Sequence, residues 1–277
     1  MFEPENLSEK FNVVPGKAPS DNIRKVMKDM ALHTDEVDLD KIEDFVILDS
    51  LKEMNLYQSL KTDEQRIAKI KVDDFKPYWK FLNNPVIDVV DQDTLEKCKK
   101  KLEILKGNKE VMDLFSNVNE ATDFELDVKP TETYAEKYLN SKLTNYNFGL
   151  HGYIDYFKID YSKKEVIICD LKTTGKSISE FVETIDFYNY WLQAAIYYKL
   201  VLDFLSENSL DNAQIKKILF KFVVIDTYNQ VYVFDVTEST MESWAQGLKI
   251  ELDQADYHYS NKNYNLPYDF LIRKVVL

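Results

Sequence analysis

Asp155, Asp170 and Lys172 are three charged residues whose types and spacing could form one chemical site. Carboxylates are the ligands that Mg²⁺ prefers, usually one or two of them together with waters and phosphate oxygens. A lysine beside such carboxylates can counter the negative charge that develops on a phosphate when water attacks it. The order Asp, then Asp-x-Lys, therefore indicates hydrolysis of a phosphodiester bond.

A β-hairpin would bring these three side chains together. Residues 150–160 and 165–172 have the composition and alternation of strands. A tight turn centred midway between them places Asp155 directly opposite Asp170. The two-residue period of a strand then puts Lys172 on the same face of the sheet as both carboxylates.

Two opposed carboxylates in apolar strands need a compensating positive charge. Their mutual repulsion is unfavourable, and burying each one costs several kcal/mol unless it is paired. A divalent metal ion ligated by Asp155, Asp170 and the Leu171 carbonyl would supply that charge, and Lys172 would add more. The alternative is an ordinary hairpin that carries a surface Asp-Asp-Lys salt-bridge set, since strand register is easily misjudged.

A long helix is predicted over residues 187–205 and carries a second polar signal. Tyr190, Gln193, Ala194 and Tyr197 recur at helical spacing and form one stripe. A glutamine in such a stripe needs a hydrogen-bond partner if it is buried. The helix could therefore point Gln193 into the site, although a peripheral glutamine on an amphipathic helix fits the same pattern.

The remaining elements predict an α/β protein with a mixed central sheet flanked by helices, behind a helical N-terminal region. Residues 1–118 are assigned to that helical region and residues 119–277 to the core. The further expectations are a helix opened by a capping box at Asp93 and Glu96 and ending near Gly107, a strand over 121–128, a polar insertion over 131–147, a strand pair over 218–226 and 230–236, and a helix from Thr237 towards Tyr259.

Composition excludes several classes of protein. The 277 residues carry a net charge of -13, which argues against a protein that coats nucleic acid through many basic contacts. The two cysteines are too few for a disulfide scaffold or a four-cysteine iron–sulfur cluster. No apolar run is long enough to span a bilayer and no secretory signal is visible, so we expect a cytoplasmic protein.

Three short motifs together resemble a known family. Gly-x-x-Asp ends at Asp155, Asp-Leu-Lys-Thr-Thr starts at Asp170, and Gln-Ala-Ala-x-Tyr-Tyr starts at Gln193. In this order they are similar to the PD-(D/E)XK nuclease superfamily, in particular its RecB/RecE-like branch, which includes phage recombination exonucleases such as lambda exonuclease. The resemblance implies a restriction-endonuclease-like core, Lys172 as the catalytic lysine, and Gln193 with Tyr197 as a supporting helix motif.

The resemblance also implies cofactors and partners. It predicts dependence on Mg²⁺ or Mn²⁺, with two ions, and DNA as the substrate. It further suggests a single-strand annealing or DNA-binding partner protein, a homo-oligomer, and the cytoplasm of a host cell if the gene belongs to a phage. Candidate further residues are Glu125 or Glu120 as an upstream metal ligand, and His151, Lys176 and Tyr197 as substrate contacts.

Two other functions remain open from the sequence. One is a non-catalytic nuclease-fold protein that binds DNA or serves as a recombination or replication accessory. An enzyme is favoured over a non-catalytic protein because Asp155, Asp170 and Lys172 are all present. The other is a structure-selective or restriction-type endonuclease, for which no target-recognition segment is evident.

Overall fold

The computed structural model describes most of the chain, in two compact units. The described residues are 11–14, 18–82, 88–115, 131–208, 215–272 and 274–275. The units are Phe2–Glu103 and Ile104–Leu277. The second unit contains the sheet, and it begins well before residue 119.

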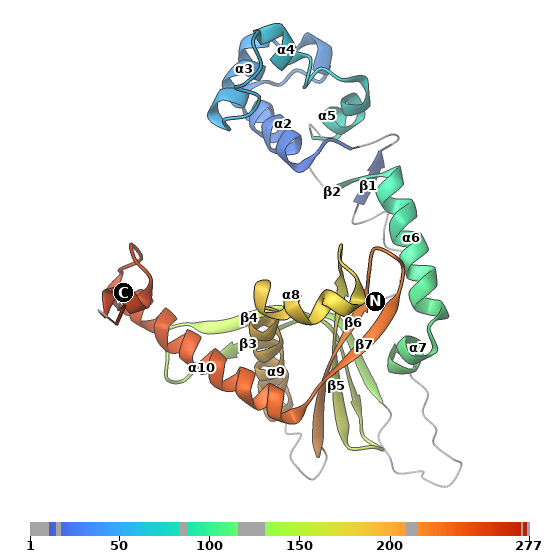
Figure 1. Cartoon of the computed structure of the whole chain (residues 1–277), viewed down its shortest axis with the longest axis vertical. Coiled ribbons are helices and arrows are strands. Elements are labelled where there is room, and N and C mark those ends of the chain that lie inside the picture. The colour runs from blue at the N-terminus through green and yellow to red at the C-terminus, as the bar shows by residue number, and fades with distance from the viewer. Residues whose placement is uncertain are drawn as a thin grey trace. The chain divides into compact units, whose positions relative to one another are not determined.

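The first unit is a small helical body (Figure 1). Its elements are β1 (Phe11–Val14), α2 (Asp21–His33), η2 (Leu39–Lys41), α3 (Asp44–Glu53), α4 (Asp63–Ile67), η3 (Asp73–Phe75), α5 (Lys76–Leu82) and β2 (Asp88–Asp91). The helical spacing of Met27 and Met30 places both in the core, where Ile47 and Trp79 are also fully buried. The short parallel pair of β1 and β2 was not predicted, because four-residue strands carry too little pattern.

Helix α6 (Gln92–Gly107) begins in this unit and ends in the next. Its cap differs from the prediction. The Thr94 amide donates to Asp91 Oδ1 at 2.6 Å, and the Ala18 amide donates to Asp91 Oδ2 at 2.9 Å. Asp91 therefore caps the helix in place of Asp93, which forms an exposed ion pair with Lys97.

The second unit is a five-stranded mixed sheet flanked by helices (Figure 1). Its elements are α7 (Lys109–Phe115), β3 (Glu132–Lys142), β4 (Gly149–Asp160), β5 (Glu165–Thr173), η4 (Ile178–Glu180), α8 (Phe181–Phe187), α9 (Tyr190–Glu207), β6 (Lys217–Ile225), β7 (Val231–Val236), α10 (Glu238–Asn261) and α11 (Tyr268–Leu271). The strand order is β3-β4-β5-β6-β7. Only β5 and β6 pair in parallel among these strands, because the α8–α9 crossover connects them.

One prediction in this unit was wrong. The polar segment expected to be an insertion contains β3, because pairing with β4 outweighs its weak strand composition. The helix expected over 187–205 is α9, which begins at Tyr190. The short helix α8 before it, in a stretch expected to be polar, was not predicted, and Asn189 between the two helices is in a left-handed conformation (φ 55°). The strand expected over 121–128 lies outside the described residues.

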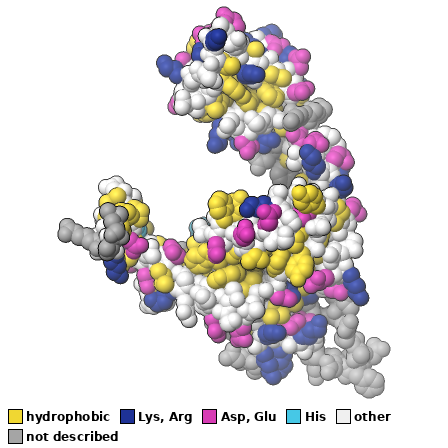
Figure 2. Space-filling view, viewed as in Figure 1, with side chains coloured by type: hydrophobic (Ala, Val, Ile, Leu, Met, Phe, Trp, Pro, Cys, Tyr) yellow, Lys and Arg dark blue, Asp and Glu magenta, His cyan; other side chains and the backbone are white. Residues whose placement is uncertain are grey.

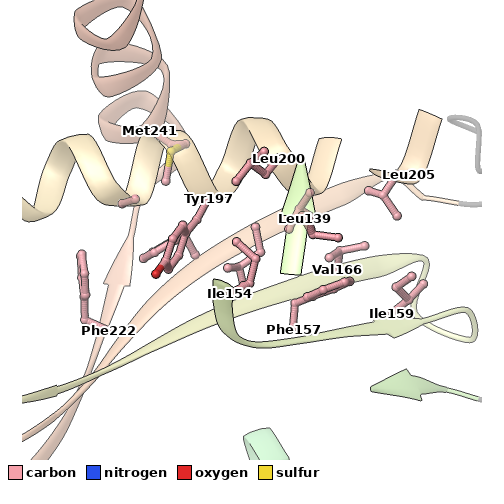
Figure 3. Close-up of a cluster of buried hydrophobic side chains, with 14 of the residues drawn as sticks. Leu139, Ile154, Phe157, Ile159, Val166, Tyr197, Leu200, Leu205, Phe222 and Met241 are labelled. Atoms are coloured by element: carbon pink, nitrogen blue, oxygen red, sulfur yellow. The ribbon is translucent and has the colours of Figure 1, made fainter. Parts of the chain in front are cut away.

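The main core lies between α9 and one face of the sheet. Charged side chains of both signs are scattered among hydrophobic and polar ones over the surface in Figure 2, whereas α9 is largely apolar. In Figure 3, Tyr197 and Leu200 from α9 point towards Ile154 and Phe157 of the sheet, and Met241 of α10 adds to the same cluster. This packing fixes the helix that carries Gln193 over the strands that carry the acidic residues. No helix in the described part of the chain is both long and apolar enough to cross a membrane.

Candidate active site

The hairpin of β4 and β5 has the predicted register. Tyr156 pairs with Cys169 and Asp160 with Glu165, around the turn between the strands. The ladder stops after the Tyr156–Cys169 pair, although β4 continues along β3 and β5 continues along β6. Asp155 and Asp170 therefore lie where the two strands begin to separate.

The backbone at Asp155 departs from a regular strand. The β3–β4 ladder skips Asp155 and Glu136, and Glu136 has a left-handed φ of 47°. Ile154 and Phe157 both belong to the core under α9, although regular alternation would place them on opposite faces. This departure directs Asp155 towards β5, where its Oδ2 accepts a hydrogen bond from the Leu171 amide at 3.0 Å.

Asp170 is a buried carboxylate with incomplete pairing. Its residue surface is 1% exposed, and its Oδ1 has no hydrogen-bond partner among the described residues. Oδ2 forms an ion pair with Lys172 Nζ at 2.7 Å. Burial raises the pKa of Asp170 to about 7; the Lys172 ammonium opposes this rise and the Asp155 carboxylate adds to it. An unsatisfied buried oxygen of this kind requires an explanation such as a bound ion, a water or a catalytic role.

Lys172 is held by three groups on one side of the sheet. Its ammonium donates to Gln193 Oε1 at 2.7 Å, besides its ion pair with Asp170. It also lies 4.5 Å from the centroid of the Tyr190 ring, within cation–π range. Gln193 Nε2 in turn donates to the Tyr197 hydroxyl at 2.8 Å. The stripe on α9 thus orients the lysine. The sequence suggested that Gln193 points into the site, but it did not identify Lys172 as the partner of Gln193 or Tyr190 as a contact of the lysine.

The donor set fits a hard divalent cation. Mg²⁺ commonly takes one or two carboxylates and completes its shell with waters and substrate oxygens. Asp155 and Asp170 supply two carboxylates, and the strand geometry turns the Leu171 carbonyl towards the same edge as its amide. No group of three acidic, histidine or cysteine side chains suited to a metal is found in the described ranges. The predicted upstream ligands Glu125 and Glu120 lie outside those ranges.

The predicted substrate contacts are not all brought to this cluster. Tyr197 is buried beneath Gln193 and supports it. His151 is exposed, next to Gly152 in β4, and its ring lies 6.1 Å from that of Tyr138. Gly152 lies against Tyr197 and Leu200 of α9, so strand alternation points His151 to the opposite face.

Lys176 is exposed in the loop that follows β5, before the helical turn η4. The sequence suggested that free amides at this helix start could bind phosphate. The structure gives two of those amides protein partners: Ser177 N donates to Glu180 Oε2 at 3.2 Å, and Ile178 N donates to Asp226 Oδ2 at 3.2 Å. These two amides are therefore not available to a ligand.

Comparison with known proteins adds little to this geometry. No family model matches the sequence, and no curated protein matches it. One solved structure that matches comes from Eubacterium rectale and is provisionally named an exonuclease. It shares 12% sequence identity with this chain, and the match covers 100% of this chain and 92% of that one, with a TM-score of 0.44. This similarity is too low to support a functional argument, so the assignment depends on the site itself.

Proposed function

We propose that this chain is a metal-dependent deoxyribonuclease of the PD-(D/E)XK type. The observation that carries the proposal is the buried Asp170 carboxylate, which has an unsatisfied oxygen and lies beside Asp155 and Lys172 where β4 and β5 separate. A structural salt bridge would satisfy both oxygens of a carboxylate that is 1% exposed. A cation site explains why one oxygen is left open.

Each residue has a distinct role in the proposed reaction. Asp155 and Asp170 would hold Mg²⁺ or Mn²⁺, and the bound ion supplies Lewis-acid polarisation of the phosphate and activation of water. Lys172 presents a positively charged donor that neutralises a non-bridging phosphate oxygen as negative charge develops. Gln193 holds the lysine at 2.7 Å and so limits its motion before the reaction.

The finer assignment is an exonuclease that processes DNA ends in recombination. The resemblance of the three motifs to phage recombination exonucleases supports this choice, and so does the net charge of -13. An acidic surface disfavours extended contacts along a duplex and favours action at a confined position such as a strand end. A second metal ion, a single-strand annealing or DNA-binding partner protein and a homo-oligomer belong to the same proposal.

A time course on DNA with two topologies tests the proposal. Purified protein is incubated with Mg²⁺ or Mn²⁺ and with either end-labelled linear duplex or closed circular DNA. We expect release of short labelled products from the linear DNA, survival of the circle, and no reaction after chelation of the metal. Cleavage of the circle would indicate an endonuclease, and a lack of reaction with every duplex and single strand would contradict the proposal.

A non-catalytic DNA-binding protein is the second candidate. The observation that favours it is that the described residues bring only two carboxylates to the site, with no third acidic, histidine or cysteine ligand. Metal binding separates the candidates before any cleavage assay. Calorimetric titration with Mn²⁺ should show a site that Asp170→Asn abolishes if the chain is an enzyme of this type.

A further inference from the structure

The corner between α8 and α9 exposes two adjacent aromatic side chains beside the candidate active site. Phe187 is 78% exposed and Tyr188 is 57% exposed. Large aromatic side chains are among those that proteins most often remove from water. In Figure 2, hydrophobic side chains gather on the face where α8 lies, between a few charged groups. Two consecutive exposed rings at one corner therefore need an explanation beyond packing.

The two rings continue into the site through direct contacts. The Phe187 and Tyr188 rings meet edge to face at 4.8 Å, and the Tyr188 ring lies 5.5 Å from the Tyr190 ring. The ammonium of Lys172 in turn lies over the Tyr190 ring, 4.5 Å from the ring centroid. An uninterrupted series of aromatic contacts thus leads from solvent to the lysine of the proposed reaction.

The backbone holds this corner in a defined position. Asn189 adopts a left-handed conformation (φ 55°, ψ 35°), which asparagine tolerates better than most residues. The carbonyl of Asn189 accepts the amide of Gln193 at 3.2 Å, and the Tyr188 amide donates to the Thr184 carbonyl at 3.0 Å. The turn that projects the rings therefore also starts the helix that orients Lys172.

The charges around the corner favour a base rather than a phosphate as the occupant. Glu183 and Asp186 are exposed on α8 and would repel a nucleic-acid backbone. The whole chain also has a net charge of -13. Aromatic stacking does not depend on positive charge, and it is the usual way in which proteins hold single-stranded bases without reading their sequence.

We propose that Phe187 and Tyr188 form a stacking platform for an unpaired base of a DNA strand end, next to the phosphate that the site cleaves. This inference rests on the proposed function, because that function makes the occupant a nucleotide. The platform would make binding depend on the presence of bases, and it would favour frayed or single-stranded ends over blunt duplex.

Base-dependent binding of the full-length protein tests the platform directly. The probes are a fluorescein-labelled single-stranded oligothymidylate and an oligomer of abasic residues with the same length and label. Anisotropy is measured with Ca²⁺ in place of Mg²⁺ so that binding is observed without turnover. We expect the wild type to prefer the base-containing oligomer by roughly tenfold or more. Equal affinity for both oligomers would overturn the proposal.

Variants distinguish stacking from general hydrophobic contact. Phe187→Ala combined with Tyr188→Ala should abolish the preference for bases, and Phe187→Leu should weaken it although it keeps an apolar side chain. Tyr188→Phe should retain it. Phe45→Ala, which removes a phenylalanine that is 60% exposed in the other unit, is the matched control and should leave the preference unchanged. A normal preference in Phe187→Leu would contradict stacking.

Two outcomes separate this inference from the proposed function. If the wild type prefers bases but cleaves no DNA with Mg²⁺ or Mn²⁺, the nuclease proposal fails and the platform stands. If it cleaves DNA but binds both oligomers equally, the platform fails alone. A change from oligomer to monomer in the double alanine variant, measured by light scattering and without any base preference in the wild type, would show instead that the rings bind a second copy of the chain.

Discussion

Two buried aspartates at neighbouring strands of the same sheet have opposite environments. Asp170 in β5 is 1% exposed, and its Oδ1 has no hydrogen-bond partner among the described residues. Asp226 follows β6 directly and is 0% exposed, and it accepts three backbone amides, from Tyr228 and Gln230 at 2.8 Å each and from Ile178 at 3.2 Å. The same residue type is thus used on adjacent strands, once with a complete set of partners and once without.

This difference indicates what each carboxylate does. Asp226 ties the β6–β7 turn to the start of η4, so its charge is compensated by amides that the fold itself provides. Within the described part of the chain, Lys172 is the one cationic partner of Asp170, which also faces the Asp155 carboxylate. Folding alone gains little from such an arrangement, and a site that must accept a cation explains why it is kept.

The largest expected effect is loss of cleavage in Asp170→Asn. This change keeps the shape of the side chain but removes the negative charge that would hold the metal ion. We expect the rate of DNA cleavage to fall by roughly 10²–10³-fold or more. The melting temperature at neutral pH should stay the same or rise, because burial raises the pKa of Asp170 to about 7, so that folding disfavours its ionised form relative to its neutral form. A variant that cleaves DNA like the wild type would show that the site is wrongly assigned.

For Asp226→Ala we expect the reverse: a loss of stability while the metal site is retained. The substitution leaves three buried or half-buried amides without their acceptor, and each such loss costs about 1–3 kcal/mol. We expect the free energy of unfolding to decrease by about 3 kcal/mol or more, measured by urea denaturation. The remaining folded protein should still bind Mn²⁺. Loss of metal binding with unchanged stability would instead place Asp226 in the site.

Sequence reasoning found the candidate site because local rules determine most of it. Strand composition and a tight turn specify the β4–β5 register, and helical periodicity specifies that Gln193 and Tyr197 share a face. The sequence does not show that Asp226 has a full set of hydrogen-bond partners and Asp170 does not. This difference depends on the amides of η4 and of the β6–β7 turn, which only the folded chain brings to Asp226.

The parts that sequence reasoning missed depend on long-range pairing. The departure of Asp155 from the ladder requires the left-handed Glu136 in β3, a strand whose polar composition suggested an insertion. The short helix α8 was not predicted, because its seven residues include several polar ones, and the start of α9 was expected at Phe187 because Phe187 and Tyr188 extend the apolar and aromatic pattern of that helix. The cap of α6 by Asp91 is visible only with the β1–β2 pair in place.

A smaller effect is expected from the groups that orient Lys172. Gln193→Leu removes the acceptor at 2.7 Å from the ammonium, and Tyr197→Phe removes only the hydroxyl that holds Gln193. We expect Gln193→Leu to lower kcat by roughly tenfold and Tyr197→Phe by less, with KM for DNA nearly unchanged, because the residues act through Lys172. Gln193→Glu should retain more activity than Gln193→Leu since it keeps an acceptor. An equal loss in both would indicate a packing defect.

The smallest expected effect concerns a third buried aspartate, Asp91, and the acid sensitivity of the backbone around it. The Thr94 hydroxyl, together with the Thr94 and Ala18 amides, lowers the pKa of Asp91, whereas burial raises that of Asp170. A carboxyl whose pKa is lowered by folding stabilises the protein above its unfolded pKa of about 3.9, and that stability is lost as the pH falls through the folded value. We therefore expect hydrogen-exchange protection around Ala18 and Thr94 to decrease when the pH falls from about 5 to about 3, after correction for intrinsic exchange. Asp91→Asn should reduce the protection at pH 5 and flatten its pH dependence, because the neutral amide cannot titrate. If hydrogen-exchange protection in Asp91→Asn falls with pH as steeply as in the wild type, other carboxyl groups cause this acid sensitivity.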